Sequence, residues 1–338
     1  MFETQPHDEL IVFVTERKQR ESGVPTMASR DLDMTTPRQA DAISKILTQV
    51  ATDVLEINSI EQLSDTLQAL DDPLVLPHWN GLGSRNRTGL ATSICEAFGK
   101  RFIGADTYAR LVTADKSLSK VFLKQSGVKF PKSIFVASSD DFQLINFLSM
   151  PCIVKPNMEG SSIGIDQNSL VSDRLSAEER CNMLLASFPS GVIVEEYISG
   201  SEVSFSALCN QGQLKYWAAA ERIVEDDPEY LKNHVYDHEL KFTGLRKLAL
   251  RPFDLPAQED IQAIKRLVKL LGHIDFIRLD GRVRNGRFHA IEITVDPLLT
   301  PRSEFIGGLS LSGRSPEAIF YDIIDISKQA WKCRQTNN

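Results

Sequence analysis

The stretch IRLDGRVRNGRFHAIEITVDPLLTPRSEF (Ile277–Phe305) carries the clearest fold signal in this chain. Two strand-like segments flank Asn285–Gly286, a dipeptide typical of a tight turn between antiparallel strands. Asp280 and Glu292 lie at or near the strand ends, so this pairing would bring both carboxylates to one point, as a hard divalent cation requires. Arg278 shares the strand face of Asp280, two residues away. The alternative is a surface hairpin of alternating charge.

A second stretch, IVKPNMEGSSIGI (Ile153–Ile165), predicts an anion site. A buried strand ends at Lys155, and a turn rich in Gly and Ser follows. Such a backbone lets several N–H groups converge on an anion, and the lysine adds a point charge. The lysine precedes the turn, so this is not a Walker A loop. The alternative is a hairpin with a solvated lysine.

A third stretch, GVIVEEYISGSE (Gly191–Glu202), runs from an apolar strand into acidic residues. Backbone groups at such a strand end can pair with a purine edge. The carboxylate of Glu202, beyond the turn, can accept hydrogen bonds from ribose hydroxyls. Taken alone the signal is weak, because acidic residues after a strand are usually solvated.

Together, in their order and spacing, the three stretches resemble the ATP-grasp ligase superfamily, and within it the D-alanine–D-alanine ligase-like branch, over about Leu74–Ile324. The resemblance implies an α/β (α+β) ATP-grasp fold of three domains, with ATP between the last two. These are an N-terminal α/β substrate domain (1–110), a central domain (111–205) and a C-terminal domain with a lid loop and the metal site (206–338). It also implies an ADP-forming carboxylate–amine ligase that makes a dipeptide or related amide through an acyl phosphate.

The resemblance assigns roles to individual residues. The cofactors would be ATP and Mg²⁺, with Mn²⁺ as an alternative metal. ATP phosphates would be held by Lys116, Lys155 and Lys241, adenine by Glu195, Glu196 and Ile198, and ribose by Glu202. The metal ligands would be Asp280, Glu292 and Thr294, and Arg278 would face the acyl phosphate. The substrates would lie near His78, Ser161, Ser303, Leu298, Phe242 and Asp33, with Ser303 on the second substrate's carboxylate.

Three positions depart from the family pattern: Thr294 replaces an Asn, Leu298 a Gly and Phe242 a Tyr. These changes cluster on the substrates, which favours a relative that acts on non-standard substrates in specialised metabolism. One alternative is a D-alanine–D-alanine or an ester-forming D-alanine–D-lactate ligase. Two others are a kinase that stops at the acyl phosphate and, in another class, an ATP-binding protein without turnover.

Composition narrows the class of protein. The chain has 338 residues, of which 42% are hydrophobic and 25% charged, which fits two or three globular domains. Its net charge of −7 argues against a general nucleic-acid binder.

No apolar run reaches about 18 residues, so no membrane partner is expected. Five scattered cysteines without a CxxC argue against a disulfide scaffold and favour the cytoplasm. The expected partners are small carboxylate and amine (or hydroxy acid) substrates and, as in relatives, a second copy of the chain.

Hydrophobic periodicity outlines the rest of the chain. Expected strands are Leu10–Val14 and Pro73–Pro77, the latter leading into a loop at His78 that would form a wall of the site. Expected helices are Ala40–Val50, Asp115–Ser126, Glu259–Leu271 and Ile319–Trp331, the middle two ending at Gly127 and Gly272. Glu221–Lys241 is expected to be a mobile lid loop. Arg282, Arg284 and Arg287 are expected on the solvated face of the hairpin.

Overall fold

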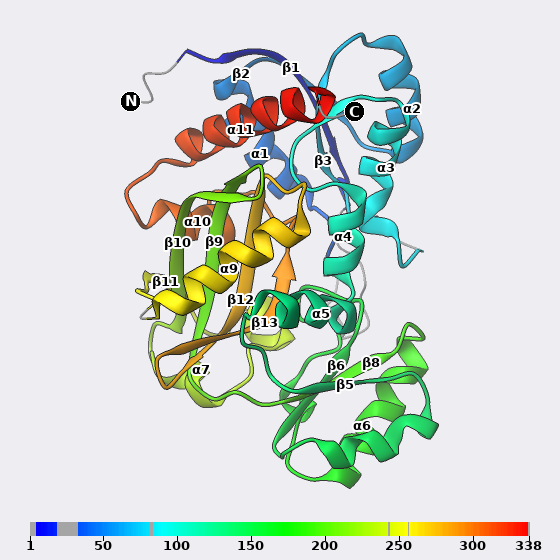
Figure 1. The fold of residues 1–338 in the computed structure, drawn as a ribbon, viewed down its shortest axis with the longest axis vertical. Coiled ribbons are helices and arrows are strands. Elements are labelled where there is room, and N and C mark those ends of the chain that lie inside the picture. The colour runs from blue at the N-terminus through cyan, green and yellow to red at the C-terminus, as the bar shows by residue number, and fades with distance from the viewer. Residues whose placement is uncertain (1–4, 19–32, 82–83, 243, 256, 337–338) are drawn as a thin grey trace.

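The computed structural model describes residues 5–18, 33–81, 84–242, 244–255 and 257–336, which form three sheets (Figure 1). The N-terminal sheet is parallel, in the order β2 (Ala51–Ile57), β1 (His7–Thr15), β3 (Leu74–His78) and β4 (Arg101–Phe102). Its helices are α1 (Pro37–Val50), α2 (Ile60–Ala69) and α3 (Leu90–Ala97). The carboxyl ends of parallel strands gather at one edge, so β3 delivers His78 to the edge where ligands bind in such sheets.

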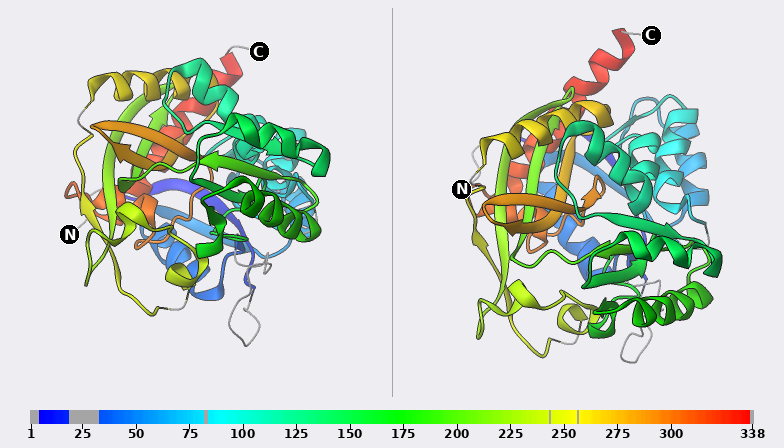
Figure 2. Two further views of the ribbon diagram at one scale, coloured as in Figure 1. Left: turned by 90° about the horizontal axis from the view of Figure 1, so that it is seen from below. Right: turned by 60° about the horizontal axis from the view of Figure 1, so that its bottom comes forward.

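The central sheet is antiparallel and forms a lobe with one long helix. Its order is β5 (Ser133–Val136), β8 (Val192–Glu196), β6 (Cys152–Pro156) and β7 (Leu170–Val171), and α6 (Arg174–Ser187) packs against it. In Figure 1 this lobe lies at the bottom of the view, and Figure 2 shows it from two other directions. The apolar side chains of β6, β8 and α6 form a core of their own, among them Val154, Val194 and Leu184.

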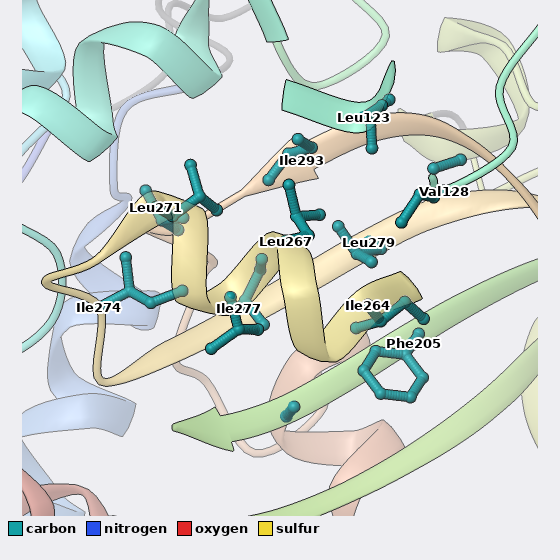
Figure 3. Close-up of a cluster of buried hydrophobic side chains, with 14 of the residues drawn as sticks. Leu123, Val128, Phe205, Ile264, Leu267, Leu271, Ile274, Ile277, Leu279 and Ile293 are labelled. Atoms are coloured by element: carbon teal, nitrogen blue, oxygen red, sulfur yellow. The ribbon is translucent and has the colours of Figure 1, made fainter. Parts of the chain in front are cut away.

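The C-terminal sheet is also antiparallel and has the longest strands. Its order is β11 (Leu248–Pro252), β10 (Gln213–Val224), β9 (Ser201–Asn210), β12 (Phe276–Arg284) and β13 (Arg287–Thr294). One face packs against α9 (Gln258–Leu271) and α5 (Lys116–Ser126), where Leu267 and Leu123 meet Leu279 (Figure 3). The other face packs against α10 (Glu304–Ser310) and α11 (Pro316–Thr336), which share a core with α1 and the N-terminal sheet.

Local sequence signals account for several boundaries. Gly127 ends α5 in a left-handed conformation (φ 79°), as expected of a glycine C-cap. Asn285 (φ 52°) and Gly286 (φ 70°) form the turn between β12 and β13, which requires two successive positive φ angles that Asn and Gly adopt more readily than other residues. The expected helices at 40–50, 115–126, 259–271 and 319–331 correspond to α1, α5, α9 and α11, with Asp115 as the N-cap of α5.

Other expectations need correction. The segment Glu221–Lys241 is not a continuous loop: it begins inside β10 and contains the short helices α7 (Tyr230–Asn233) and α8 (His238–Phe242). Strand β2 was not anticipated, although it follows α1 directly. The expected domain boundary at 205/206 falls inside β9, and α5, expected in the central domain, packs on the C-terminal sheet. The expected limits of the three domains stay a prediction.

Four of the five cysteines have described side chains. Cys95, Cys152, Cys181 and Cys209 are buried and free, and burial raises the pKa of each thiol. The side chain of Cys333 lies outside the described residues. Among the described helices, none combines the length and the apolar character needed to cross a membrane.

Candidate active site

The hairpin β12–β13 places four polar side chains on one face of the C-terminal sheet. Asp280 is the register partner of Glu292, and Arg278 is the partner of Thr294. Because side chains alternate along a strand, all four point to the same side. Arg278 donates three hydrogen bonds of 2.7–3.0 Å to Asp280, and Ser204 of the neighbouring strand β9 donates a fourth of 2.6 Å. The expected meeting of Asp280 with Glu292 is therefore present in the strand register.

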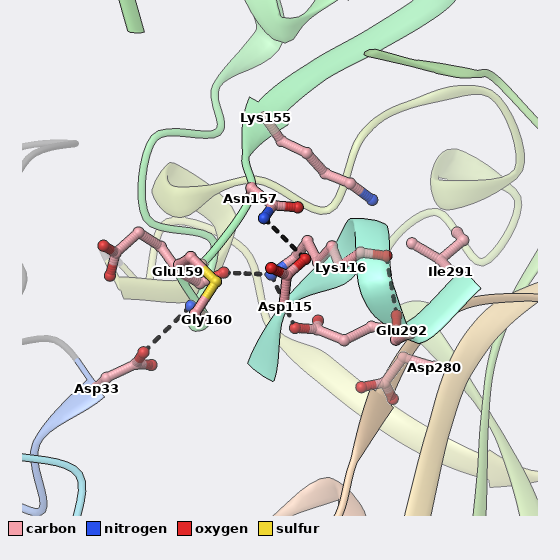
Figure 4. A network of polar contacts seen from close by, with 12 residues as sticks. Asp33, Asp115, Lys116, Lys155, Asn157, Glu159, Gly160, Asp280, Ile291 and Glu292 are labelled. Carbon is pink, nitrogen blue, oxygen red and sulfur yellow. Dashed lines mark hydrogen bonds and ion pairs between the residues drawn. The ribbon is translucent and has the colours of Figure 1, made fainter. Parts of the chain in front are cut away.

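Lys116 brings the start of α5 to this face. Its Nζ lies 3.0 Å from Oε1 of Glu292 and also donates to the backbone carbonyl of Glu159 (Figure 4). The position of α5 is held by Asn157, which accepts from the Ser117 N–H and donates to the Asp115 carboxylate, each over 2.9 Å. Since Asn157 follows β6, this pair of bonds joins the turn after β6 to the first turn of α5.

Lys155 lies in a buried ion triad on the central sheet. Its Nζ is 2.9 Å from Oε1 of Glu195, and Nζ of Lys120 is 2.7 Å from the other oxygen of that carboxylate. Burial raises the pKa of Glu195, but the two lysines outweigh it and hold the pKa below its usual value. Glu195 is therefore ionised and orients Lys155. Sequence reasoning missed Lys120, whose partner lies on a different element.

Two cavities meet at the hairpin. The first contains about 1100 Å³ of empty space and lies between the N-terminal sheet and the hairpin. The second contains about 900 Å³ and lies between the central and C-terminal sheets. The residues that line both cavities are Lys116, Glu159, Gly160, Ser161, Lys241, Arg278, Glu292 and Glu304. This shared wall is where a group bound in one cavity can react with a group bound in the other.

The turn after β6 belongs to that wall. Ser161 (φ 50°) and Ser162 (φ 58°) adopt the left-handed conformation, which is uncommon for residues other than glycine. The Gly160 N–H donates to the Asp33 carboxylate over 3.1 Å, and a Cβ on Gly160 would lie 2.9 Å from the same oxygen. Arg87 also approaches Asp33, at 3.8 Å. Asp33 therefore contacts the turn directly and lines the first cavity.

Most of the residues expected at the site line one of the two cavities. In the first are Asp33, His78, Lys116, Ser161, Lys241, Arg278, Glu292, Thr294 and Leu298. Lys155, Glu195, Glu202 and Asp280 line the second. Burial, reinforced by Arg110, lowers the pKa of His78 to about 4, so its imidazole is neutral at pH 7.

Four expected residues do not line the described cavities with a described side chain. Glu196 accepts from the Ser149 N–H over 2.8 Å, and Ile198 is buried. Ser303 is buried, and its hydroxyl caps α10 by accepting from the Ile306 N–H over 3.2 Å. The side chain of Phe242 lies outside the described residues. The roles assigned to all these residues stay predictions.

The structure also corrects one expectation and adds residues. Arg282 does not lie on a solvated face: it is buried, pairs with Glu202 over 2.8 Å and donates to the Tyr197 hydroxyl over 2.9 Å. Glu304 and Arg222, absent from the expected site, form an ion pair of 2.6 Å in the wall of the second cavity. No motif flagged either residue, because the pair joins strands and helices far apart in the sequence.

The acidic side chains fit a magnesium ion that is shared with a phosphate ligand. Among the residues that the structure describes, no group of three His, Cys, Asp or Glu could hold a metal by itself. Mg²⁺ is commonly bound by one or two carboxylates together with substrate phosphates and water. Asp280 and Glu292 supply such a pair, and lysines stand beside it for the phosphate charge.

Comparison with known proteins agrees with this arrangement. The family described as "D-ala D-ala ligase C-terminus" matches residues 122–325. A D-alanine–D-alanine ligase of Thermotoga petrophila is 30% identical over 250 residues, which is 72% of this chain and 75% of that protein. The chain belongs to the D-alanine–D-alanine ligase family. It is therefore an ATP-grasp enzyme, an ADP-forming ligase of carbon–nitrogen bonds that uses ATP and Mg²⁺.

Two further comparisons give the same family and fold. The D-alanine–D-alanine ligase of Flavobacterium psychrophilum is 27% identical over 229 residues, 66% of each chain. The crystal structure of the Bacillus anthracis D-alanine–D-alanine ligase complexed with ATP superposes with a TM-score of 0.70 at 20% identity, over 97% of this chain and 99% of that one. The expected ATP-grasp fold is confirmed.

Proposed function

We propose that this enzyme activates the carboxylate of D-alanine with ATP and joins it to the amine of a second small substrate. The relatives named above are D-alanine–D-alanine ligases, which supports D-alanine as the first substrate. This replaces the expectation of non-standard substrates in specialised metabolism, which no comparison supports. The ester-forming alternative differs only in the second substrate and is tested in the same assay.

One observation carries the proposal. Arg278 and Glu292 belong to the wall that both cavities have in common, and Asp280 shares their face of the hairpin and lines the second cavity. A ligase of this kind must bring a phosphate from one pocket to a carboxylate in another, and a mixture of cationic and acidic groups is needed at that point. The Lys116 ammonium beside Glu292 adds a further cation there.

The proposed role of each residue follows from the cavity that it lines. Lys155, oriented by Glu195, and Lys116 would hold the ATP phosphates from the second cavity. Mg²⁺ bound by Asp280 and Glu292 would supply positive charge to those phosphates. Arg278 lies in both cavities, so its guanidinium would stabilise negative charge on the acyl phosphate and on the tetrahedral adduct as it develops.

Other residues would bind the first substrate and keep water out. Asp33, beside the turn at Gly160, would hold the ammonium of D-alanine, and neutral His78 would line its pocket without adding charge. Lys241 on α8 lines both cavities, so closure of this segment over the phosphates would protect the acyl phosphate from hydrolysis.

The test is release of ADP, with the product identified by mass spectrometry. D-Alanine is supplied as the first substrate, together with D-alanine, D-serine or D-lactate as the second and L-alanine as the stereochemical control. Amide products that require D-alanine support the proposal, and an ester with D-lactate supports the alternative. ATP binding without ADP release from any pair would contradict it and favour a binding protein. The cytoplasmic location and the homodimer stay predictions.

A further inference from the structure

Asp296 places a carboxylate in the first cavity, just after the end of β13. Its side chain keeps 21% of its surface exposed and lines the first cavity but not the second. Asp280 has the opposite placement, since it lines only the second cavity. The two aspartates therefore lie on opposite sides of the shared wall, and Asp296 lies on the side proposed for the first substrate.

Arg110 is the ion-pair partner of Asp296. It lies on α4 (Thr107–Ala114), is buried, and has its Nη1 atom 3.6 Å from Oδ2 of Asp296. The same guanidinium donates to the backbone carbonyls of Ala105 and Thr88, over 3.2 and 3.4 Å. A separation of 3.6 Å is too long for a hydrogen bond. The Asp296 carboxylate thus has a fixed cation beside it and keeps acceptor capacity for a ligand in the cavity.

Asp33 is a second carboxylate on the same side of the shared wall. It lines the first cavity, and its negative charge acts on that of Asp296. Its carboxylate accepts from the Gly160 N–H over 3.1 Å and lies 3.8 Å from Arg87. Arg87 is bound more closely by Glu159, over 2.9 Å. Both carboxylates are therefore held loosely by an arginine, and they repel each other.

The other cations in the wall of the first cavity interact most strongly with other acidic side chains. These pairs are Arg278 with Asp280, Lys116 with Glu292, and Lys241 with Glu304. Arg278 attracts Asp296 less than Arg110 does, and Lys241 attracts Asp33 less than it attracts Glu304. A ligand ammonium between Asp33 and Asp296 would meet acceptors on both sides and would relieve their repulsion. Such charge-assisted bonds are strong in a partly desolvated site.

We propose that Asp296 is a second binding group for the ammonium of the first substrate, opposite Asp33, and that Arg110 positions it. The inference rests on the proposed function and adds a residue to the recognition of the first substrate. Two carboxylates around one ammonium favour an amino acid over a hydroxy acid of the same size, because a neutral hydroxyl gains much less from them. As the first acid, D-alanine should therefore be strongly preferred to D-lactate.

The test uses hydroxylamine as the acceptor, so that hydroxamate formation reports activation of the first acid alone. The enzyme receives ATP and Mg²⁺ with either D-alanine or D-lactate. In Asp296→Asn, we expect KM for D-alanine to rise at least about tenfold, with less than about a threefold change in kcat. Asp296→Glu keeps the charge and should hold KM within about threefold of the unmodified enzyme. For D-lactate, kcat/KM, or its inhibition constant against D-alanine if it is not activated, should change less than about threefold in Asp296→Asn.

Controls separate ammonium binding from other roles of Asp296. Asp53→Asn removes an exposed carboxylate on β2, outside both cavities, and should leave KM unchanged. Damage to the cavity would weaken D-alanine and D-lactate alike, and Asp296→Glu would not restore KM. A metal-binding role would raise the Mg²⁺ concentration that Asp296→Asn requires and leave KM for D-alanine unchanged. Either result, or no effect of Asp296→Asn at all, would overturn the inference.

A failure of this inference can be told apart from a failure of the proposed function. No hydroxamate from D-alanine with the unmodified enzyme would refute the proposed function. The role of Asp296 is then judged from calorimetric binding of D-alanine to enzyme loaded with adenylyl imidodiphosphate and Mg²⁺. At least about tenfold weaker binding in Asp296→Asn supports it, whereas equal binding, or no binding to either protein, overturns it.

Discussion

Nζ of Lys116, at the start of α5, lies 3.0 Å from Oε1 of Glu292 on β13. This ion pair joins the segment before the central sheet to the hairpin of the C-terminal sheet. Asp280, the register partner of Glu292, stands on the same strand face. The nucleotide side of the enzyme is therefore assembled from elements that only the folded chain brings together.

Asp280→Asn removes the charge of one carboxylate of the hairpin pair and leaves its size unchanged. We expect ADP release to fall at least about 100-fold, since the affinity for the metal and the charge around the phosphates both depend on this group. Three of the hydrogen bonds to Asp280 come from Arg278 on the same strand, so the fold should persist. A coupled ADP assay measures the loss, and circular dichroism checks the fold. Full activity in a folded variant would refute the metal assignment.

Glu195→Gln leaves Lys120 and Lys155 buried without their shared carboxylate. Breaking a buried ion pair by removing one partner is costly, so we expect the free energy of unfolding to fall by about 3 kcal/mol. Urea unfolding followed by fluorescence measures it. The matched control is Glu196→Gln, one residue away, whose carboxylate accepts the backbone N–H of Ser149 at the surface. Equal effects of the two substitutions would contradict the buried triad.

Glu292 should contribute to the loss of stability in acid. Burial raises its pKa, but Lys116 and Lys155 outweigh burial and bring the pKa to about 2. The group is deprotonated in the folded protein while the unfolded chain takes up a proton near its ordinary value of about 4.5. Its stabilisation is therefore present above about pH 4.5 and is lost as the pH falls toward 2.

The measurement is the free energy of unfolding from pH 7 down to pH 3, in the unmodified enzyme and in Glu292→Gln. The variant should be less stable at pH 7, and its stability should decline less between pH 5 and 3. Parallel curves for the two proteins would show that Glu292 has the same proton affinity in both states.

Gly160→Ala tests the contact between the turn and Asp33. The added Cβ would lie 2.9 Å from the Asp33 carboxylate, so that carboxylate must move. We expect KM for D-alanine to rise several-fold with a smaller change in kcat, if Asp33 holds the substrate ammonium. A double-mutant cycle with Asp33→Asn provides the control. Independent, additive effects of the two substitutions would mean that Gly160→Ala acts elsewhere.

The local signals in the sequence were sufficient for much of the architecture. Asn285–Gly286 predicts the hairpin turn, and Gly127 and Gly272 predict the ends of α5 and α9, since each depends on the φ angles of one or two residues. Strand β2 was not predicted, because it follows α1 directly and no turn signal separates the two elements. The same reasoning placed Asp280 and Glu292 together because a two-residue turn determines the register of a hairpin.

Ion pairs between elements that are distant in the sequence could not be predicted from local sequence signals. Arg282 looks like part of an exposed basic cluster, yet it is buried beside Glu202, and Glu195 looks like a solvated acid, yet it lies between Lys120 and Lys155. Glu304 gives no local signal at all. By itself the amino-acid order determined the turns, the strand faces and the family. The folded chain alone decided which charges are paired and which remain open to substrate, because burial and ion pairing depend on neighbours that are remote in the sequence.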